Sequence, residues 1–272
     1  MKKKQILILS IVLVVAIAVS LFFFLPKGGS AAVKMGATAS PHAEVLEFLK
    51  PLLAEKGFTL EIVVFNDYVV PNTSTESGEL AANYFQHKPY MTDFNTERGT
   101  HLVATIPVHF EPMAIYAGKS SSLTEIPDGA TIAVPNDPTN EARALLLLEA
   151  NGIITIAEGK GLSATKLDIL ENPYNIKLEE IEAAQVPRIL PDVDFAVMNG
   201  NYALEVNLFA SKDGLASEAL DSLAAETYIN YVVVKEGNEN TKFMQALREV
   251  INTDAVRKFI ADKYQGAVVA AF

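Results

Sequence analysis

The sequence predicts an α/β fold for residues 33–272, and two observations support this prediction. Beyond the segment Gly28-Gly29-Ser30, stretches typical of strands alternate with stretches typical of helices. The first such unit, residues 33–65, reads as strand, helix and strand, which indicates a parallel sheet with a right-handed crossover. The chain has 272 residues, of which 50% are hydrophobic. This composition allows one large domain or two of ordinary size, each with a buried core.

The first unit shows how the elements are assigned. Val33 to Ala37 is expected to form a short strand. Ser40 is expected to cap a helix whose apolar residues recur at helical spacing and which ends at Gly57. Pro51 should kink or break this helix, because proline lacks the backbone N–H that a helix interior uses. Leu60 to Phe65 follows as the next strand.

The alternation continues to the end of the chain. Ala130 to Val134 reads as a strand, and Asp137 caps a helix from Pro138 to Leu148, because an Asp cap followed by proline is a common helix start. Further strands are expected at 80–84, 102–106, 113–116, 176–181, 195–198 and 229–234. Further helices are expected near 187–191, 201–207, 239–251 and 254–263.

The N-terminus has the composition of a membrane segment. Lys2, Lys3 and Lys4 precede the apolar run Ile6 to Leu25. A helix of that length spans roughly 30 Å, the thickness of a bilayer core, whereas secretory signals have apolar regions of only about 7 to 15 residues. We therefore expect an uncleaved anchor, with cleavage after Ser30-Ala31-Ala32 as the alternative. In both cases the positive-inside rule places residues 33–272 outside the cytoplasm.

Composition excludes several functional classes. Lysine and arginine number 22 against 33 acidic residues, and the formal net charge of -11 argues against binding of nucleic acid. The chain has no cysteine, so thiolate metal sites, iron–sulfur clusters and cysteine nucleophiles are impossible. Of the four histidines, His87, His101 and His109 lack the i, i+4 spacing of a helical zinc site. No motif for nucleotide binding or serine hydrolysis is present, so we expect no cofactor and no catalysis.

Ligands of open α/β sheets bind beyond the carboxyl ends of the strands, and this rule selects the candidate residues. Arg143 has a half-apolar helical face, so its guanidinium needs an anionic partner. That partner is either a ligand carboxylate or an internal acid, such as Glu111 or Glu141. Asn199 and Asn201 flank Gly200 after a strand, where they can bind a zwitterion or simply form a turn.

An aromatic segment forms the other candidate. Residues 83–90 contain three aromatic side chains around His87, in a chain with 8% aromatics and no tryptophan. Such rings can enclose the apolar part of a ligand, with the histidine making one hydrogen bond, or they can belong to the core. The same two interpretations apply to Tyr68 and Tyr90.

A family resemblance accounts for many of these residues. The matching runs are Gly36-Ala37-Thr38, Pro41-His42-Ala43-Glu44, Asp67-Tyr68-Val69, Pro71-Asn72, Asn83-Tyr84-Phe85-Gln86-His87, Glu111-Pro112-Met113, Pro135-Asn136-Asp137-Pro138, Asn140-Glu141-Ala142-Arg143-Ala144-Leu145, Glu182-Ala183-Ala184-Gln185, Asn199-Gly200-Asn201-Tyr202-Ala203 and Lys263-Tyr264-Gln265-Gly266-Ala267-Val268. In these runs, over about residues 33 to 272, the sequence resembles the methionine-binding lipoproteins of the NlpA type. These are the substrate-binding components of methionine ABC importers.

The resemblance implies a two-lobed periplasmic-binding-protein fold with two crossover strands. Residues 1–32 would be the membrane anchor or signal segment plus linker, residues 33–113 and 230–272 the first lobe, and residues 114–229 the second. Matching the motifs implies that Arg143 holds the carboxylate of methionine and that Asn199 and Asn230 hold its polar groups. The side chains implied to surround the thioether are Tyr68, Phe85 and Tyr90, with His87 bonding nearby.

The implied partners are L-methionine or a close analogue, an ABC permease and its ATPase, and the cell membrane. The domain would lie on the extracytoplasmic side. The chain departs from the family in lacking the cysteine to which a lipid is normally attached, so we expect the apolar N-terminus to replace the lipid as a tether. Two alternatives remain: a metal-binding transport component that uses His87 and carboxylates, and a hydrolase on the same scaffold.

Overall fold

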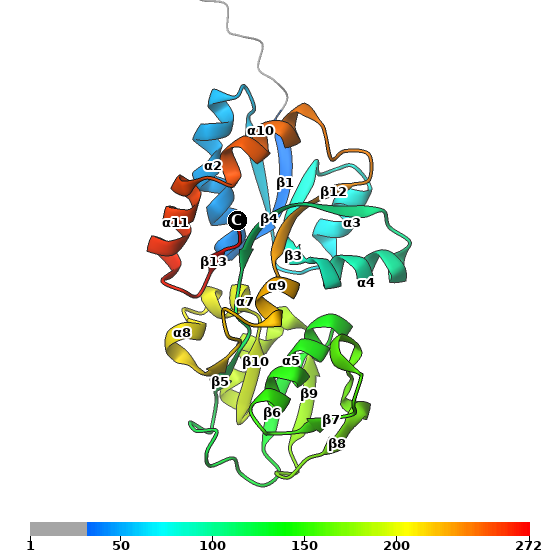
Figure 1. Ribbon diagram of the computed structural model, residues 1–272, viewed down its shortest axis with the longest axis vertical. Helices are drawn as coiled ribbons and strands as arrows, with labels where there is room; N and C mark the ends of the chain where they lie inside the picture. Colours follow the sequence, from blue (N-terminus) through cyan, green and yellow to red (C-terminus); the bar gives the residue numbers. More distant parts are fainter. Residues whose placement is uncertain (1–31) are drawn as a thin grey trace, which may run out of the picture. The chain divides into compact units, whose positions relative to one another are not determined.

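The computed structural model describes residues 32–272, and residues 33–272 form one compact unit (Figure 1). The expected membrane anchor or signal helix lies outside the described residues. Within the part that is described, no helix has both the length and the apolar character needed to cross a membrane.

The first sheet has six strands in the order β13-β4-β12-β3-β1-β2. Its strands are β1 (Val33–Thr38), β2 (Leu60–Phe65), β3 (Ala82–His87), β4 (Leu102–Phe110), β12 (Asn230–Lys235) and β13 (Val269–Ala270). Helices α2 (Glu44–Glu55), α10 (Lys242–Ile251) and α11 (Asp254–Tyr264) cover one face, and α3 (Val70–Glu76) and α4 (Lys88–Arg98) lie on the other (Figure 1).

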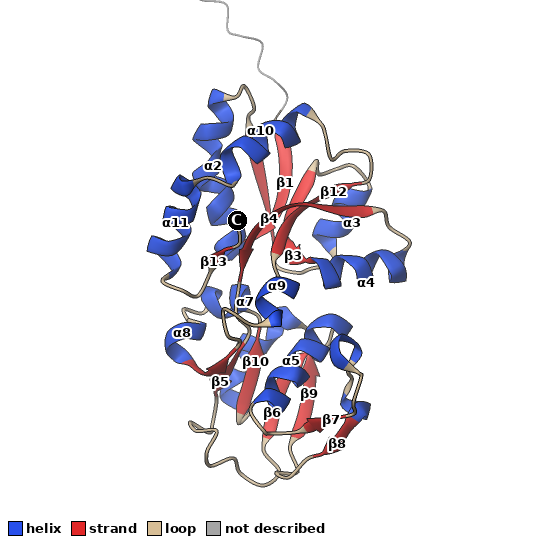
Figure 2. Cartoon of the chain, viewed as in Figure 1, coloured by secondary structure: helices blue, strands red, loops and turns tan. Residues whose placement is uncertain are grey.

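The second sheet has five strands in the order β11-β5-β10-β6-β9. Its strands are β5 (Ala114–Ala117), β6 (Thr131–Pro135), β9 (Lys177–Ile181), β10 (Phe195–Met198) and β11 (Gly214–Ser217). The helices around it are α5 (Pro138–Ala150), α6 (Val186–Ile189), α7 (Gly200–Glu205) and α8 (Ala210–Asp213), and a small sheet joins β7 (Thr155–Ile156) to β8 (Ile169–Glu171). Figure 2 shows the strands of each sheet flanked by helices.

Each sheet buries apolar side chains on both faces. In the first sheet, Met35, Tyr84 and Val232 pack with the apolar sides of α2, α10 and α11. In the second sheet, Ile132 and Val197 pack against the leucines of α5. The other faces are buried in two further apolar clusters, one with residues of α4 and one with residues of α6 and α7. Burial on both faces explains the largely apolar strands in the sequence.

The chain passes between the two sheets twice. It leaves the first sheet after β4 and enters the second at β5, and it returns through α9 (Leu223–Thr227) to β12. Because β12 enters from the other direction, it runs antiparallel to both β3 and β4. The expected α/β class is therefore present, but the first sheet is mixed rather than parallel.

Three local predictions were wrong. Ser40 does not cap the first helix: it is extended within the turn Ala39–Ala43 (φ -124°, ψ 141°), and its hydroxyl donates to Glu44. Helix α2 continues through Pro51 to Glu55, because its buried face, formed by Val45, Leu49 and neighbouring leucines, is held against the sheet. Strand β3 begins at Ala82 rather than at residue 80.

Candidate functional site

A narrow cavity lies where residues from both sheets meet. It is lined by all seven of the site residues expected from the sequence: Tyr68, Phe85, His87, Tyr90, Arg143, Asn199 and Asn230. Gln86, Glu111, Asn140, Gly200 and Asn201 complete the lining. Six of the seven lie at or just beyond the carboxyl ends of β2, β3, β6 and β10, as the rule for open α/β sheets predicts, whereas Asn230 begins β12. The cavity volume is ≈ 20 Å³, which is room for about one water molecule.

One wall of the cavity is aromatic. The Tyr68 ring centroid lies 5.6 Å from those of Phe85 and Tyr90 and 5.0 Å from that of Tyr202. Phe85 and Tyr90 also pack with Met91 and Phe94 in an apolar cluster. The interpretation of the aromatic segment as core is therefore confirmed for Phe85 and Tyr90, and the same rings also line the cavity.

Both ring nitrogens of His87 are hydrogen-bonded, and one of these bonds reaches from the first sheet to helix α5. Nδ1 accepts from the backbone N–H of Tyr90 at 3.2 Å, at the start of α4. Nε2 therefore carries the proton of the neutral ring and lies 3.2 Å from Oδ1 of Asn140, to which it donates. Burial lowers the pKa of His87 to about 3, so the imidazole is neutral. Because neither nitrogen is left for another partner, this geometry gives no support to metal binding by His87.

Arg143 is engaged by an internal acid, as one of the two interpretations expected. That acid is Glu218: Nε donates to Oε1 at 2.8 Å and Nη2 to Oε2 at 2.6 Å. Nη2 also donates to the backbone carbonyl of Glu111 at 2.8 Å. Burial alone would disfavour the charged guanidinium, but Glu218 outweighs it and the pKa of Arg143 is raised. Glu141, one of the two acids expected as partners, instead accepts from the backbone N–H of Lys166.

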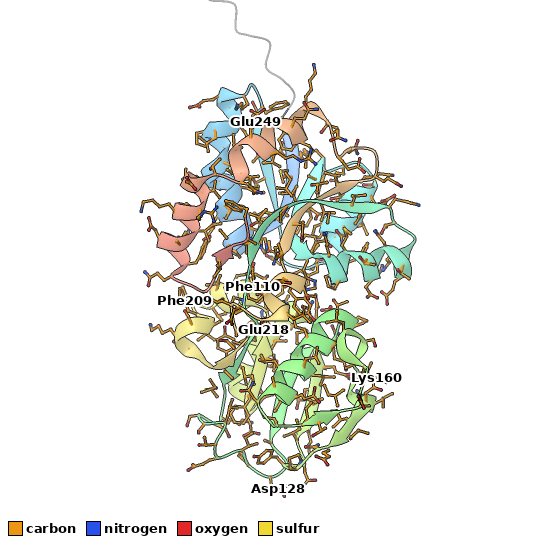
Figure 3. All side chains as sticks on the ribbon, in the orientation of Figure 1. Phe110, Asp128, Lys160, Phe209, Glu218 and Glu249 are labelled. Carbon is orange, nitrogen blue, oxygen red and sulfur yellow. The ribbon has the colours of Figure 1, made fainter. Side chains whose placement is uncertain are left out.

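The guanidinium still has one side available. Nη1 makes no hydrogen bond to any described residue, and Arg143 lines the cavity. Tyr228 lies under the guanidinium, with Cζ 4.1 Å from the ring centroid. Phe110 and Glu218, both labelled in Figure 3, contact the same guanidinium. Arg143 is thus held rigidly while two N–H groups remain for another acceptor.

A chain of hydrogen bonds orients the amides of the site. Asp137 caps α5 as expected, and its carboxylate also accepts from Nδ2 of Asn140 at 2.9 Å. This orientation presents Oδ1 of Asn140 to Asn199, whose Nδ2 donates to it at 2.8 Å. Asp137 therefore fixes the orientation of Asn199 through two successive hydrogen bonds, by way of Asn140. Its Oδ1 is buried and has no hydrogen-bond partner among the described residues.

Asn201 carries a second unpaired polar atom. Its Oδ1 accepts from the hydroxyl of Tyr68 at 2.6 Å, and its Nδ2 is buried without a partner in residues 32–272. Buried polar atoms are nearly always hydrogen-bonded, so unpaired ones require an explanation. Here the acceptor Oδ1 of Asn199 and the donor Nδ2 of Asn201 belong to residues that line the same small cavity.

Two histidines and a glutamate, side chains that also bind metal ions in proteins, lie together beside the cavity. His42, His109 and Glu111 are buried, with potential ligand atoms within 4.8 Å of one another. Nε2 of His109 lies 2.6 Å, and Nε2 of His42 3.2 Å, from the same oxygen, Oε1 of Glu111. The second nitrogen of each ring contacts a hydroxyl, that of Thr38 or Tyr84. This is the arrangement of a hydrogen-bond network, since every ring nitrogen already has a partner.

Sequence reasoning missed Glu218, and no local pattern could have identified it. It lies 75 positions from Arg143, outside any helix or strand. Asn140 was present in the matched runs but was not chosen as a site residue. Its role follows from Asp137, since an Asp cap and the third helical residue are neighbours.

The comparisons with known proteins agree along the whole described chain. The family model described as NlpA lipoprotein matches residues 33–272. The membrane lipoprotein TpN32 of Treponema pallidum is 42% identical over 238 residues, which cover 88% of this chain and 87% of that protein. The D-methionine-binding lipoprotein MetQ of Salmonella typhimurium is 39% identical over 240 residues, 87% of each chain. A nutrient-binding protein from Burkholderia cenocepacia, solved bound to methionine, has a TM-score of 0.84 and 40% identity, and the match covers 89% of this chain and 100% of that one.

Proposed function

This chain belongs to the NlpA lipoprotein family, and from that membership we propose that it is the substrate-binding component of a methionine ABC importer. The protein would capture L-methionine or a close analogue and deliver it to a permease driven by a cytoplasmic ATPase. The relatives whose names state a ligand bind D-methionine or methionine. No bond is made or broken in this function, so the chain would act as a binding protein and not as an enzyme.

The observation that carries this proposal is the set of unpaired polar atoms beside an aromatic wall. Asn199 offers an acceptor, while Asn201 and Nη1 of Arg143 offer donors. A zwitterion needs both kinds, because its ammonium donates and its carboxylate accepts. The rings of Tyr68, Phe85 and Tyr90 supply apolar contact for a thioether side chain.

In this proposal Arg143 acts through the free side of its guanidinium. Glu218 holds the Nε side, and Nη1 donates to the ligand carboxylate. Asn230 would contribute as well: its Oδ1 accepts from Nε2 of His42 at 3.1 Å, which leaves its amide N–H groups for the ligand. His87 would support the site by holding Asn140, rather than by bonding the ligand itself.

Ligand entry would require the two halves to separate. We propose that residues 33–113 with 230–272 and residues 114–229 act as two lobes joined by the two crossovers. Two hydrogen bonds now close the cavity between them, from Tyr68 to Asn201 and from His87 to Asn140. A cavity of ≈ 20 Å³ is far smaller than an amino acid, so these bonds would break on opening and the two lobes would close around the ligand at a wider separation.

The membrane location is also a proposal. The relative TpN32 is named a membrane lipoprotein. This chain has no cysteine to carry a lipid, so the apolar run at residues 6–25 would tether the binding domain on the extracytoplasmic side.

Calorimetry with the purified full-length chain tests the function. We expect binding of L-methionine or D-methionine, and an affinity at least tenfold weaker in Asn201→Ala, because that variant removes a ligand donor and the partner of Tyr68. Asn252→Ala, at an exposed position, is the matched control and should bind like the wild type. A wild-type chain that binds neither enantiomer nor a methionine analogue would refute the proposal.

A further inference from the structure

Glu111 is the only carboxylate that lines the cavity among the described residues. It follows β4 at the first crossover between the sheets and is 5% exposed. Removing a carboxylate from water in this way is unfavourable unless a cation or several donors compensate its charge. The partners of Glu111 therefore indicate what is missing.

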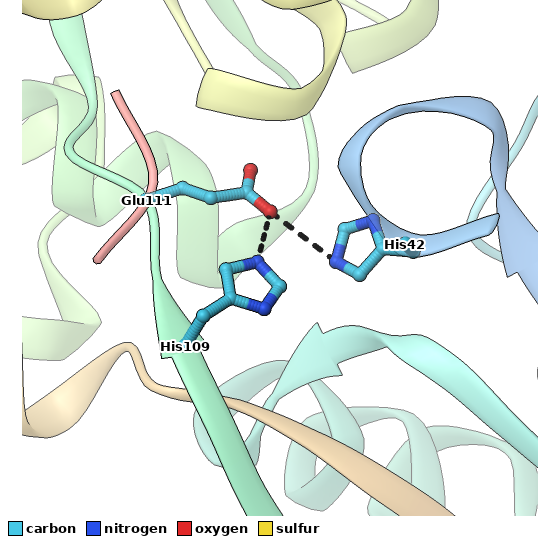
Figure 4. A group of neighbouring side chains, drawn as sticks. All are labelled: His42, His109 and Glu111. Carbon is cyan, nitrogen blue, oxygen red and sulfur yellow. Dashed lines mark hydrogen bonds and ion pairs between the residues drawn. The ribbon is translucent and has the colours of Figure 1, made fainter. Parts of the chain in front are cut away.

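The two histidines beside Glu111 provide donors but no charge. Figure 4 shows the rings of His42 and His109 directed at the same carboxylate oxygen, Oε1. Oδ1 of Asn230 also lies 3.1 Å from Nε2 of His42, and because both neighbours are acceptors, this nitrogen carries the proton. Burial lowers the pKa of His42 to about 4 and that of His109 to about 3. Both imidazoles are therefore neutral at physiological pH.

The nearest guanidinium is already paired. Arg143 forms its two-point ion pair with Glu218, and it contacts Glu111 only at the backbone carbonyl. The guanidinium and Glu218 cancel each other in charge. The side chain of Glu111 is thus a buried carboxylate whose direct partners are dipolar, with the guanidinium of Arg143 nearby but not in an ion pair with it.

The second oxygen of Glu111 faces the other wall of the cavity. No side-chain donor of residues 32–272 reaches Oε2, although the backbone N–H of Asn201 donates to this carboxylate. A Cβ atom built on Gly200 would lie 3.2 Å from Oε2 and 2.8 Å from Cβ of Glu111, so only glycine allows the carboxylate to sit there. Asn199, whose Oδ1 is an unpaired acceptor, precedes this glycine. Oε2 of Glu111 and Oδ1 of Asn199 are therefore two acceptors in the same part of the cavity lining.

We propose that Glu111 binds the ammonium group of the ligand and so makes the site selective for amino acids over carboxylic acids that lack the amine. This inference rests on the proposed function, because it assigns one end of the zwitterion bound there. The carboxylate end belongs to Nη1 of Arg143 and to the asparagine donors. His42 and His109 act as positioning residues that hold Oε1, and the acceptor capacity that remains on Oε2 beside the backbone N–H of Asn201 is left for the ligand.

Proton linkage provides an independent signature. Burial raises the pKa of Glu111, and a bound ammonium would lower it again, so binding should release protons in mildly acidic solution. The titratable and charged groups that face Glu111 from the surrounding elements are His42, His109, Arg143, Tyr68, Tyr84, Tyr116 and Tyr264, with Glu218 behind Arg143. Burial raises the pKa values of these tyrosines and lowers those of the two histidines, whereas the pKa of Glu111 is raised from its ordinary value.

The test compares methionine with its desamino analogue, 4-(methylsulfanyl)butanoate, in wild type and Glu111→Gln. We expect the substitution to weaken methionine binding at least tenfold and to change binding of the desamino analogue less than about twofold. Glu179→Gln, an exposed acid on β9, is the matched control and should leave both affinities unchanged. An equal loss for the two compounds, or no loss for either, would overturn the assignment.

A second measurement needs no variant. Calorimetry in buffers of different ionisation enthalpy, between about pH 4 and about pH 7, counts the protons released when wild type binds methionine. A release that rises toward acid supports the assignment, and its absence over the whole range contradicts it. Stabilisation by Zn²⁺ that His109→Gln abolishes would also overturn it, because the three side chains would then hold a cation of a different kind.

Failure of the proposed function can be distinguished from failure of this inference. If methionine does not bind but another amino acid does, the same comparison with the desamino form of that amino acid decides the role of Glu111. A wild-type chain that binds no amino acid refutes both.

Discussion

At the scale of single residues, the Arg143–Glu218 pair shows how a buried charge can serve packing and recognition together. Glu218 also accepts from the backbone N–H of Met113 at 2.8 Å, so the same carboxylate holds both the arginine and the first crossover. A single substitution at Arg143 therefore does two things. It removes the group that is proposed to bind the carboxylate of the ligand, and it leaves Glu218 buried without a cation.

These two effects can be separated. Arg143→Ala should lower the free energy of unfolding by about 3–5 kcal/mol, because an unpaired buried charge remains, and should weaken methionine binding at least tenfold. The double variant Arg143→Met with Glu218→Leu should recover at least half of the lost stability but none of the affinity. Urea unfolding and calorimetry measure the two quantities. Recovery of wild-type affinity in the double variant would show that Arg143 has only a structural role.

At the scale of elements, the start of α5 links helix capping to the site. Asp137 caps the helix through the backbone N–H of Asn140 at 3.0 Å and orients the side chain of the same residue. That side chain then holds both His87 and Asn199. A common helix-start motif, legible in the sequence, thereby positions side chains from both sheets.

A pair of cap variants tests this link. Asp137→Ala should destabilise the protein by about 1–2 kcal/mol and also weaken methionine binding several-fold, because Asn140 loses its orientation. Thr253→Ala removes the cap of α11, which accepts from the backbone N–H of Val256 away from the cavity. It should cost similar stability and leave the affinity unchanged. Equal affinity losses in the two variants, measured by calorimetry beside thermal unfolding, would contradict the link.

At the scale of the whole molecule, three of the four histidines are buried as neutral rings. His42 is 1% exposed, His87 6% and His109 0%, and the pKa values of all three lie at about 3 to 4 because of burial. Their unfolded-state pKa is about 6.5. Between these values the unfolded chain binds more protons than the folded one, so stability falls as the pH decreases.

We therefore expect the free energy of unfolding to decrease from about pH 6.5 toward about pH 4, with each histidine contributing about 1.4 kcal/mol per pH unit. The raised pKa of Glu111 acts in the opposite sense and offsets part of this slope. His109→Gln should reduce the slope, as measured by urea unfolding over a pH series. His101→Gln, at an exposed histidine, controls for the substitution itself. An unchanged slope in His109→Gln would show that its ring is not kept neutral by burial.

The sequence by itself determined many of the strands and helices, although not the helices α3, α4, α8 and α9, because apolar spacing and caps are local properties. The strand at 195–198, the Asp137 cap and the strand beginning near Asn230 are as predicted. The strand-end rule and the family resemblance also led to seven residues that line one cavity. Local patterns predicted the structure less well where tertiary contacts oppose a local preference. At Pro51, burial of one face of the helix outweighs the loss of the backbone N–H.

Only the tertiary structure decided which partner each of these residues has. Three features depend on side chains brought together from distant positions: the pairing of Arg143 with Glu218, the neutral state of His87 and the position of the Glu111 carboxylate between two neutral histidines. A period of two or 3.6 residues records which face of an element is buried, but not what lies across from it. Charge and protonation are set by burial and by those opposing side chains, so they appear only when the two sheets are assembled.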